Sequence, residues 1–340
     1  MKSLALATAV LGTALVAAVP VQAGAILDQI RARGDIRCGI PQPTAGWAAP
    51  DNRGVMRGMD ADTCRAVAAA LFGDAGKVNF VTTTSANRFP ALQNGEVDML
   101  ARVTTWTFSR DTTLGFNFAP PIFYDGQGLM VSARSGIKSA RELDGATVCV
   151  QPGTTTELNL ADYFRSNNMR FNAVVIESSD EIRAAFFSGR CDVYTTDRSA
   201  LASARAVAPD PRQYVVLPEV ISKEPLAPLV RHGDDQLFDI VKWTVFALIE
   251  AEEMGLTQAN VERMAAETKD PAMMRFLGRE AGFSRGAQLA DNWVINVIKA
   301  VGNYGEMYER NLGADTPLGL SRGVNNLWTK GGLMYSPPFR

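Results

Sequence analysis

The segment from Thr104 to Asp111 brings hydroxyls, an aromatic ring and a guanidinium together. It reads Thr-Thr-Trp-Thr-Phe-Ser-Arg-Asp and follows the apolar segment 97–101. The planar guanidinium of Arg110 matches both oxygens of a carboxylate, and hydroxyls such as that of Thr105 add donors. The segment therefore predicts a carboxylate site, although a single arginine in a loop is more often a solvated surface charge.

A second polar segment is Gly153-Thr154-Thr155, between a strand expected at 146–150 and a helix expected at 157–166. Glycine permits a tight turn, and the free N–H groups at the start of a helix favour an anion. No Gly-Lys-Ser/Thr follows, so this is not a Walker phosphate loop. The alternative to a ligand role is an ordinary threonine cap.

A third candidate is Asp197, which follows a buried strand expected at 191–195. Ligands of open parallel sheets bind at the carboxyl ends of the strands, so this carboxylate is placed to pair with an ammonium. The alternative is a cap for the helix expected at 199–206, and both roles can hold together.

Two successive sets of strands and helices position these segments. The first set comprises a helix at 24–33, a strand at 35–40, a helix at 60–72, a strand at 77–82, a helix at 86–94 and a strand at 97–101. The second comprises a helical turn at 140–143, the elements named above, a strand at 172–176 and a helix at 180–188. Strands that alternate with helices imply parallel sheets with right-handed crossovers. The predicted fold class is therefore α/β, with two helix-covered, mainly parallel sheets.

The first 23 residues have the pattern of a signal peptide. Lys2 is followed by an apolar core at 4–19 and by the small-residue cleavage site Val21-Gln22-Ala23. This core is too short for a membrane-spanning helix. The mature chain is expected to start at Gly24, to be exported and soluble, and to be long enough, at about 317 residues, for two lobes.

Charge and cysteine content limit the classes of partner and site. The chain has 34 basic and 36 acidic residues, and removing Lys2 leaves 33 basic residues, a balance that argues against nucleic acid as a partner.

An even number of cysteines in an exported chain suggests disulfides. Of the three possible pairings we favour Cys38–Cys64 and Cys149–Cys191, because each joins an expected strand to a nearby element of the same half. A zinc site is the weaker alternative, since there is no C-x-x-C and His232 is the only histidine.

These motifs resemble one known family. The resemblance rests on Val97-Asp98, Thr105-x-Thr107-x-x-Arg110, Phe118-x-x-Pro121-x-x-Tyr124, Gly153-Thr154-Thr155, Gly189-Arg190-x-Asp192 and Asp197. This order is similar to that of the periplasmic polar amino-acid-binding proteins of ABC importers, over roughly residues 26 to 260. The whole chain, with its long C-terminal tail, looks like the general L-amino-acid-binding subgroup.

The resemblance implies a type II periplasmic-binding-protein fold, a ligand-closing hinge and a role for each matching residue. Arg110 would hold the α-carboxylate of an amino acid, Thr155 would assist, and Asp197 would take the α-ammonium. Thr105 occupies a hydroxyl position that lines the family's cleft. The implied partners are L-amino acids and the membrane permease of an ABC transporter, with a monomeric protein and no cofactor.

The expected lobe boundaries follow from the order of the elements. Lobe 1 comprises 24–130 and 231–340, including a C-terminal helical extension, and lobe 2 comprises 131–230. The two crossings between them are expected near 128–133 and 225–230.

Two further residues are candidates for side-chain selectivity. Trp47, in the loop after the first strand, is predicted to form an aromatic wall, with core packing as the alternative. Arg88 resembles the position where glutamate- or aspartate-preferring relatives carry a cation. It is predicted to reach an acidic or amide side chain of the ligand, with a solvated helix residue as the alternative.

A binding protein is expected rather than an enzyme. A Ser/His/Asp triad would have to use His232, and no G-x-S-x-G is present. Exported cyclohexadienyl dehydratases, which act on arogenate or prephenate, share the two-lobed architecture and are the alternative function. They would need a cleft acid, and only Asp197, which the ammonium would occupy, is in place.

Overall fold

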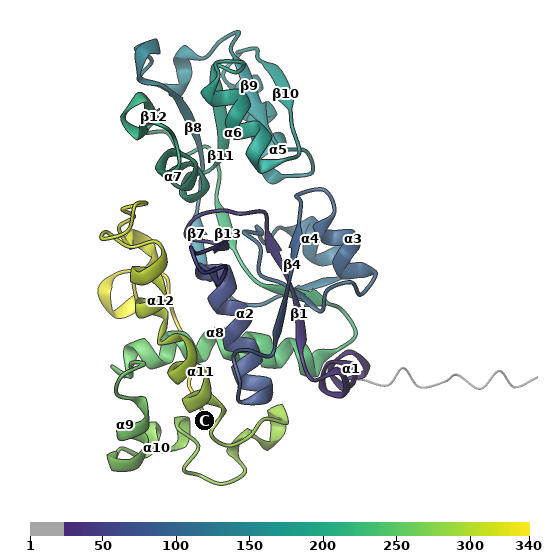
Figure 1. The fold of residues 1–340 in the computed structure, drawn as a ribbon, viewed down its shortest axis with the longest axis vertical. Coiled ribbons are helices and arrows are strands. Elements are labelled where there is room, and N and C mark those ends of the chain that lie inside the picture. Colours follow the sequence, from purple (N-terminus) through teal and green to yellow (C-terminus); the bar gives the residue numbers. More distant parts are fainter. Residues whose placement is uncertain (1–23) are drawn as a thin grey trace, which may run out of the picture.

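The computed structural model describes residues 24–340, and the signal peptide predicted over residues 1–23 lies outside the described residues. The chain forms two lobes, each built on one five-stranded sheet with helices against it (Figure 1). Lobe 2 stands at the top of Figure 1, and lobe 1 lies below it together with the C-terminal helices. The expected two-lobed α/β fold is confirmed. Within residues 24–340, no helix is both long and apolar enough to cross a membrane.

The sheet of lobe 1 has the strand order β4-β1-β5-β14-β6. Its three parallel strands are β4 (Val78–Thr83), β1 (Ile36–Pro41) and β5 (Met99–Leu100). Strand β14 (Leu229–Arg231) runs antiparallel to β5 and to β6 (Phe116–Phe118). The helices are α1 (Ala25–Arg33), α2 (Met59–Phe72), α3 (Arg88–Gln93) and α4 (Phe108–Thr112), and a small hairpin joins β2 (Ala49–Pro50) to β3 (Met56–Arg57).

The sheet of lobe 2 has the order β10-β9-β11-β8-β12. Strands β10 (Asn172–Val175), β9 (Thr147–Val150) and β11 (Val193–Asp197) are parallel, whereas β8 (Gln127–Ser132) runs antiparallel to β11 and to β12 (Tyr214–Val216). Three helices belong to this lobe: α5 (Thr155–Ser166), α6 (Ser179–Phe187) and α7 (Arg198–Ala206).

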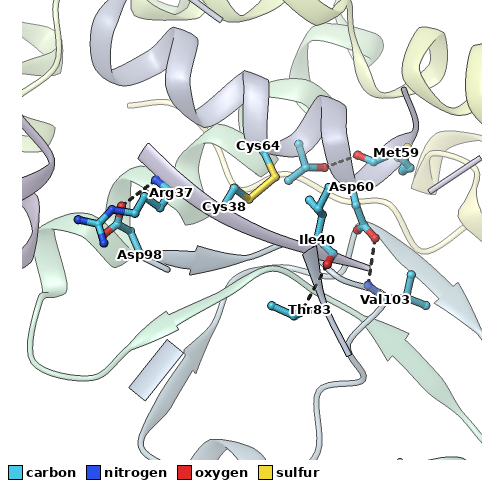
Figure 2. Close-up of a disulfide and its surroundings, with 10 residues drawn as sticks. Arg37, Cys38, Ile40, Met59, Asp60, Cys64, Thr83, Asp98 and Val103 are labelled. Atoms are coloured by element: carbon cyan, nitrogen blue, oxygen red, sulfur yellow. Dashed lines mark hydrogen bonds between the residues drawn. A yellow bond between two sulfur atoms is a disulfide. The ribbon is translucent and has the colours of Figure 1, made fainter. Parts of the chain in front are cut away.

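One aspartate in each lobe fixes the start of a central strand. The carboxylate of Asp98 accepts the backbone N–H of Arg37, the second residue of β1, at 2.8 Å (Figure 2). In lobe 2 the carboxylate of Asp192 accepts the N–H of Thr147, the first residue of β9, at 2.8 Å. Both aspartates of the recognised motifs therefore serve the sheets rather than a ligand.

Two short strands, β7 (Phe123–Asp125) and β13 (Glu224–Leu226), connect the lobes and pair antiparallel with each other. The boundaries expected at 130 and 230 fall inside β8 and β14, which belong to the sheets of lobe 2 and lobe 1 respectively. The first crossing, at β7, therefore lies a few residues before the predicted range 128–133, whereas the second, at β13, overlaps the start of the predicted range 225–230. The reason is that an apolar strand does not itself reveal which sheet it will join.

The C-terminal extension packs on lobe 1. It follows the long helix α8 (Asp235–Glu253) and contains α9 (Val261–Glu267), α10 (Pro271–Phe276), α11 (Trp293–Val301) and α12 (Tyr304–Asn311). Helices α8 and α11 pack against α2, and eleven of the fourteen residues of α2 are buried. The alanine-rich sequence of α2 suits this position, because small side chains allow close approach on several sides.

The extension also contacts the connecting strand β7. Tyr124 in β7 donates its N–H to Oδ1 of Asn325 at 2.7 Å and accepts the Asn325 amide at 3.1 Å. The hydroxyl of Tyr304 donates to the carbonyl of Ile122 at 2.9 Å, and Phe123 stacks on Tyr308 with ring centroids 5.9 Å apart. The extension thus anchors one of the two strands about which the lobes would move.

The two predicted disulfides are present. Cys38 joins β1 to Cys64 of α2, with Cα atoms 6.1 Å apart (Figure 2). Cys149 of β9 is bonded to Cys191, just before β11, with Cα atoms 5.7 Å apart. Each bridge lies within one lobe, so neither restrains movement of the lobes. All four cysteines are bonded in disulfides, which excludes a zinc site with cysteine ligands.

Candidate ligand-binding cleft

A cleft lies between the lobes, where the carboxyl ends of parallel strands from both sheets meet. Its polar lining includes Ser85, Arg88, Arg102, Thr105 and Arg110 of lobe 1 and Thr154, Thr155, Thr156, Asp197 and Ser203 of lobe 2. The cavity volume is about 90 Å³, on a scale where one water needs about 10–15 Å³. The cleft therefore has room for a small solute.

Arg110 is buried at the cleft, with 7% of its surface exposed, so it is not a solvated surface charge. Thr107 caps α4 by accepting the N–H of Arg110, which fixes the helical turn that carries the side chain. One guanidinium N–H donates to the carbonyl of Thr105 at 2.9 Å, and the group lies 5.2 Å from the centroid of the Phe89 ring. Burial lowers the pKa of Arg110, whereas Glu224 and Asp197 oppose that shift.

Glu224, in the connecting strand β13, is the centre of a buried hydrogen-bond cluster that includes two residues of the cleft lining, Thr105 and Thr155. Its carboxylate accepts four bonds, from the hydroxyls of Thr105 (2.5 Å), Thr155 (2.9 Å) and Ser222 (2.5 Å) and from the amide of Asn159 (2.8 Å). Four donors satisfy a carboxylate that is only 1% exposed. Thr105 and Thr155, two of the predicted site residues, are thus held from opposite lobes by one side chain.

The Gly153-Thr154-Thr155 turn lies at the start of α5, as predicted. Thr154 is the helix cap, since its hydroxyl oxygen accepts the N–H of Glu157 at 3.2 Å. For this residue the structure therefore shows the ordinary threonine cap that was the alternative to a ligand role. Gly153 has φ 68°, a left-handed conformation that glycine adopts without strain. Its carbonyl faces lobe 1 and accepts a guanidinium N–H of Arg88 at 3.3 Å.

Asp197 ends β11 and lines the cleft, but it does not cap α7 with its side chain. That cap comes from Asp125 in β7, whose carboxylate accepts the N–H of Ser199 at 3.1 Å. The Asp197 carboxylate accepts no hydrogen bond within residues 24–340 and is therefore available to a ligand. Burial raises its pKa well above the usual value, and Asp125 and Glu224 add to that shift, while Arg110 and Arg88 oppose it.

Arg88 and Arg102 place two more buried guanidinium groups in the cleft. Arg88 is 3% exposed, which excludes the solvated alternative, and its Nε has no hydrogen-bond partner among the described residues. Arg102, two residues after the end of β5, is 6% exposed and donates to Oγ of Ser85 at 3.2 Å. Burial lowers the pKa of Arg102 to about 10, and Asp60 opposes the shift.

The turn after Arg102 carries backbone strain. Val103 has φ 41°, a left-handed conformation that costs a β-branched residue about 1–2 kcal/mol. Its N–H donates to the buried carboxylate of Asp60 at 3.1 Å, which helps to hold the turn (Figure 2). Burial raises the pKa of Asp60 to about 8. The strained turn sets the positions of Arg102 on one side and Thr105 on the other.

Trp47 does not form a wall of the cleft. Its side chain is fully buried, belongs to the core formed with the C-terminal extension, and packs edge-on against Phe123 with centroids 5.3 Å apart. The core-packing alternative is therefore the one that the structure adopts. The cause is the extension, whose helices cover this side of lobe 1 and turn a loop tryptophan inward.

Hydrogen bonds join the two lobes across the cleft. Besides the Arg88–Gly153 bond, the N–H of Ser179 donates to the side chain of Gln42 at 2.9 Å, and the hydroxyl of Ser203 donates to the carbonyl of Ala45 at 2.6 Å. These contacts describe a closed arrangement. In the described part of the chain, no three or more His, Cys, Asp or Glu residues are grouped to hold a metal ion.

Comparison with known proteins identifies the family. Residues 36–260 match the family described as bacterial extracellular solute-binding proteins, family 3. The chain belongs to this family. The resemblance seen in the sequence is thereby confirmed.

Relatives of this solute-binding protein match it along its whole length. It is 52% identical to the general L-amino acid-binding periplasmic protein AapJ of Rhizobium johnstonii, over 100% of both chains. It is 51% identical to the glutamate/glutamine/aspartate/asparagine-binding protein BztA of Rhodobacter capsulatus, over 99% of this chain and 98% of that one. A Brucella ovis periplasmic binding protein solved with glutathione bound superposes with a TM-score of 0.90 at 51% identity, covering 92% of this chain and 99% of that one.

Sequence reasoning missed Glu224 and Arg102 in this solute-binding protein. Arg102 could have been found by the rule that singled out Asp197, because it directly follows a buried central strand. Glu224 carries no such signal. It stands between Lys223 and Pro225, just before an expected crossing, and only its partners in both lobes make it a buried residue.

Proposed function

We propose that this family 3 solute-binding protein captures L-amino acids in the periplasm and delivers them to the permease of an ABC importer. Specificity is broad, with a preference for acidic and amide side chains. The observation that carries the proposal is the pair formed by Arg110 of lobe 1 and Asp197 of lobe 2. Both are buried in the same cleft, and the Asp197 carboxylate accepts no hydrogen bond within residues 24–340.

The pair suits the two ends of a zwitterion. Burying an unpaired charge costs several kcal/mol, so a cleft that encloses an amino acid must supply partners for both its carboxylate and its ammonium. Arg110 offers a planar donor fork to the carboxylate, and the hydroxyls and helix start at Thr154 to Thr156 add donors from the other lobe. Asp197 offers a carboxylate to the ammonium. Each lobe contributes one charge, so the ligand stabilises the closed arrangement.

The preference for acidic and amide side chains rests on Arg88 and on the relatives. Arg88 lies in the cleft with an unpartnered Nε, which suits an oxygen of the ligand side chain. The name of BztA gives glutamate, glutamine, aspartate and asparagine as ligands, and that of AapJ gives L-amino acids in general. A small acidic peptide is a second ligand class, supported by the glutathione bound in the Brucella ovis structure.

Capture without chemistry is the proposed mechanism. The lobes turn about β7 and β13, enclose the ligand, and present the closed surface to the permease. Among the described residues that line the cleft, Asp197 is the only acid, and the ammonium would occupy it, so no free acid is left there to expel a leaving group. The protein is therefore proposed to be a binding protein and not an enzyme, and neither relative named above is a dehydratase.

Calorimetric titration of the mature chain with the twenty L-amino acids and glutathione tests the proposal. Micromolar affinity, about −8 kcal/mol, is expected for several of them. Removing one partner of a buried charge pair costs about 2–5 kcal/mol, so Arg110→Gln should weaken the binding of every amino acid about 30-fold or more. Arg165→Gln, at an arginine whose side chain is 76% exposed on lobe 2, is the matched control and should change nothing. Turnover of prephenate or arogenate without amino-acid binding would reject the proposal.

A further inference from the structure

Arg102 stands in the cleft without a counter-ion. None of the ion pairs within residues 24–340 involves Arg88, Arg102 or Arg110. Each of the three is at least nine-tenths buried. A buried guanidinium without a carboxylate partner is strongly disfavoured, so three together indicate that the cleft is completed by an anionic ligand.

The three guanidinium groups also keep most of their donors free. Each guanidinium carries five N–H groups. Within the described chain these side chains make only four hydrogen bonds, to the carbonyls of Gly153, Thr83 and Thr105 and to the hydroxyl of Ser85. The two bonds made by Arg102, at 3.4 Å and 3.2 Å, are long and leave its Nη1 unused. The free donors match a ligand that is rich in anionic oxygens.

A monocarboxylic amino acid does not supply enough oxygens. Its single carboxylate is taken by Arg110 and its ammonium by Asp197, which leaves Arg88 and Arg102 without an anion. Arg88 is already directed toward lobe 2, where it donates to the carbonyl of Gly153. Within residues 24–340 both hydrogen bonds of Arg102 go to lobe 1, to Thr83 and Ser85, and Arg102 stands just beyond the end of the central strand β5.

We infer that Arg102 binds a second carboxylate of the ligand, and so makes the cleft prefer dicarboxylic amino acids such as glutamate to their amides. This inference rests on the proposed function and assigns the choice between acid and amide to one residue. An amide side chain offers one acceptor oxygen and two donors, and the donors face N–H groups that cannot accept. A carboxylate offers two acceptors and neutralises the guanidinium.

The surroundings of Arg102 support this assignment. The acidic group that attracts Arg102 most strongly is Asp60, which is 1% exposed and accepts the N–H of Val103 rather than a hydrogen bond from Arg102. Burial raises the pKa of Asp60 to about 8, which favours the neutral form of this carboxyl and weakens its attraction for Arg102. Arg110 lies close enough to lower the pKa of Arg102 further, while Asp197 opposes that shift. A ligand carboxylate relieves the repulsion between the arginines.

The test is the ratio of glutamate to glutamine affinity, measured by calorimetry on the mature chain. The unaltered protein should bind glutamate at least as tightly as glutamine. Arg102→Gln should lower the affinity for glutamate about 10- to 100-fold and the affinity for glutamine less than about 3-fold. Arg102→Lys keeps the charge without the fork and should give an intermediate ratio. Thermal unfolding of the ligand-free variants checks that each is folded, and if Arg102→Gln is not, Arg102→Lys carries the same comparison.

Each outcome decides the inference. An unchanged ratio in Arg102→Gln overturns it, whether both affinities fall or neither does, because Arg102 would then have only a structural role. A preference of the unaltered protein for glutamine over glutamate also overturns it, and leaves the proposed function intact. Failure of the unaltered protein to bind any amino acid rejects the proposed function itself, and the two failures are thus distinguishable.

Discussion

Replacing Glu224 by alanine should weaken ligand binding although Glu224 does not line the cleft. The carboxylate joins Thr105 of lobe 1 to Thr155 and Asn159 of lobe 2. In the closed arrangement it is the common acceptor for donors from both sides. Its loss should therefore raise the free energy of the closed state relative to the open state.

The magnitude follows from the two bonds that reach lobe 2. The bonds from Thr155 and Asn159 measure 2.9 Å and 2.8 Å, and both are to a charged acceptor. Such bonds contribute about 1.5–3 kcal/mol each, and removing the buried charge offsets part of that sum. We expect a net loss of about 2–4 kcal/mol from the closed state, or about 30- to 1000-fold weaker binding. Glu224→Gln keeps the shape and one acceptor, so it should lose less.

Two measurements check this expectation. Calorimetry gives the affinity for glutamate, and small-angle scattering gives the radius of gyration with and without ligand. Glu224→Ala should need far more ligand to reach the compact form. Glu177→Ala, at an exposed residue of lobe 2, is the control. Affinity of Glu224→Ala within about 3-fold of the unaltered protein would refute the reasoning, because the four-bond cluster would then not contribute to closure.

Three further predictions concern pH, a disulfide and the extension. The pKa of Asp197 is raised, and the ligand ammonium needs the ionised carboxylate, so ligand affinity should fall as pH falls through that pKa. Binding should release a proton, which calorimetry in buffers of different ionisation enthalpy measures. Affinity that rises toward acid pH would contradict this prediction. Replacing both Cys149 and Cys191 by serine removes a disulfide that joins residues 42 positions apart. Denaturant titrations should then show that the free energy of unfolding of lobe 2 is lower by about 4 kcal/mol. A decrease of less than about 1 kcal/mol would argue against a stabilising role of this disulfide. Asn325→Ala removes both hydrogen bonds to Tyr124 and should speed hydrogen exchange of the Tyr124 backbone amide about tenfold. An unchanged exchange rate would mean that the extension does not stabilise β7.

Local pattern was sufficient for the elements that carry the site. Gly153 and Thr154 stand where a strand ends and a helix begins, as predicted, and Asp197, expected just beyond a strand at 191–195, is the last residue of β11. Such positions are encoded locally, because strand and helix periodicities extend over only a few residues. The disulfide partners were also predictable, since each pair lies within one lobe.

The sequence by itself determined the exported two-lobed class, the cysteine pairs and the strand-end position of Asp197. Only the tertiary structure decided which sheet β8 joins, that Trp47 lies in the core, and that Glu224 is buried. The physical reason is distance along the chain. The partners of Glu224 lie 119 and 69 residues away, at Thr105 and Thr155, so nothing near Glu224 indicates that its charge will be satisfied inside the protein.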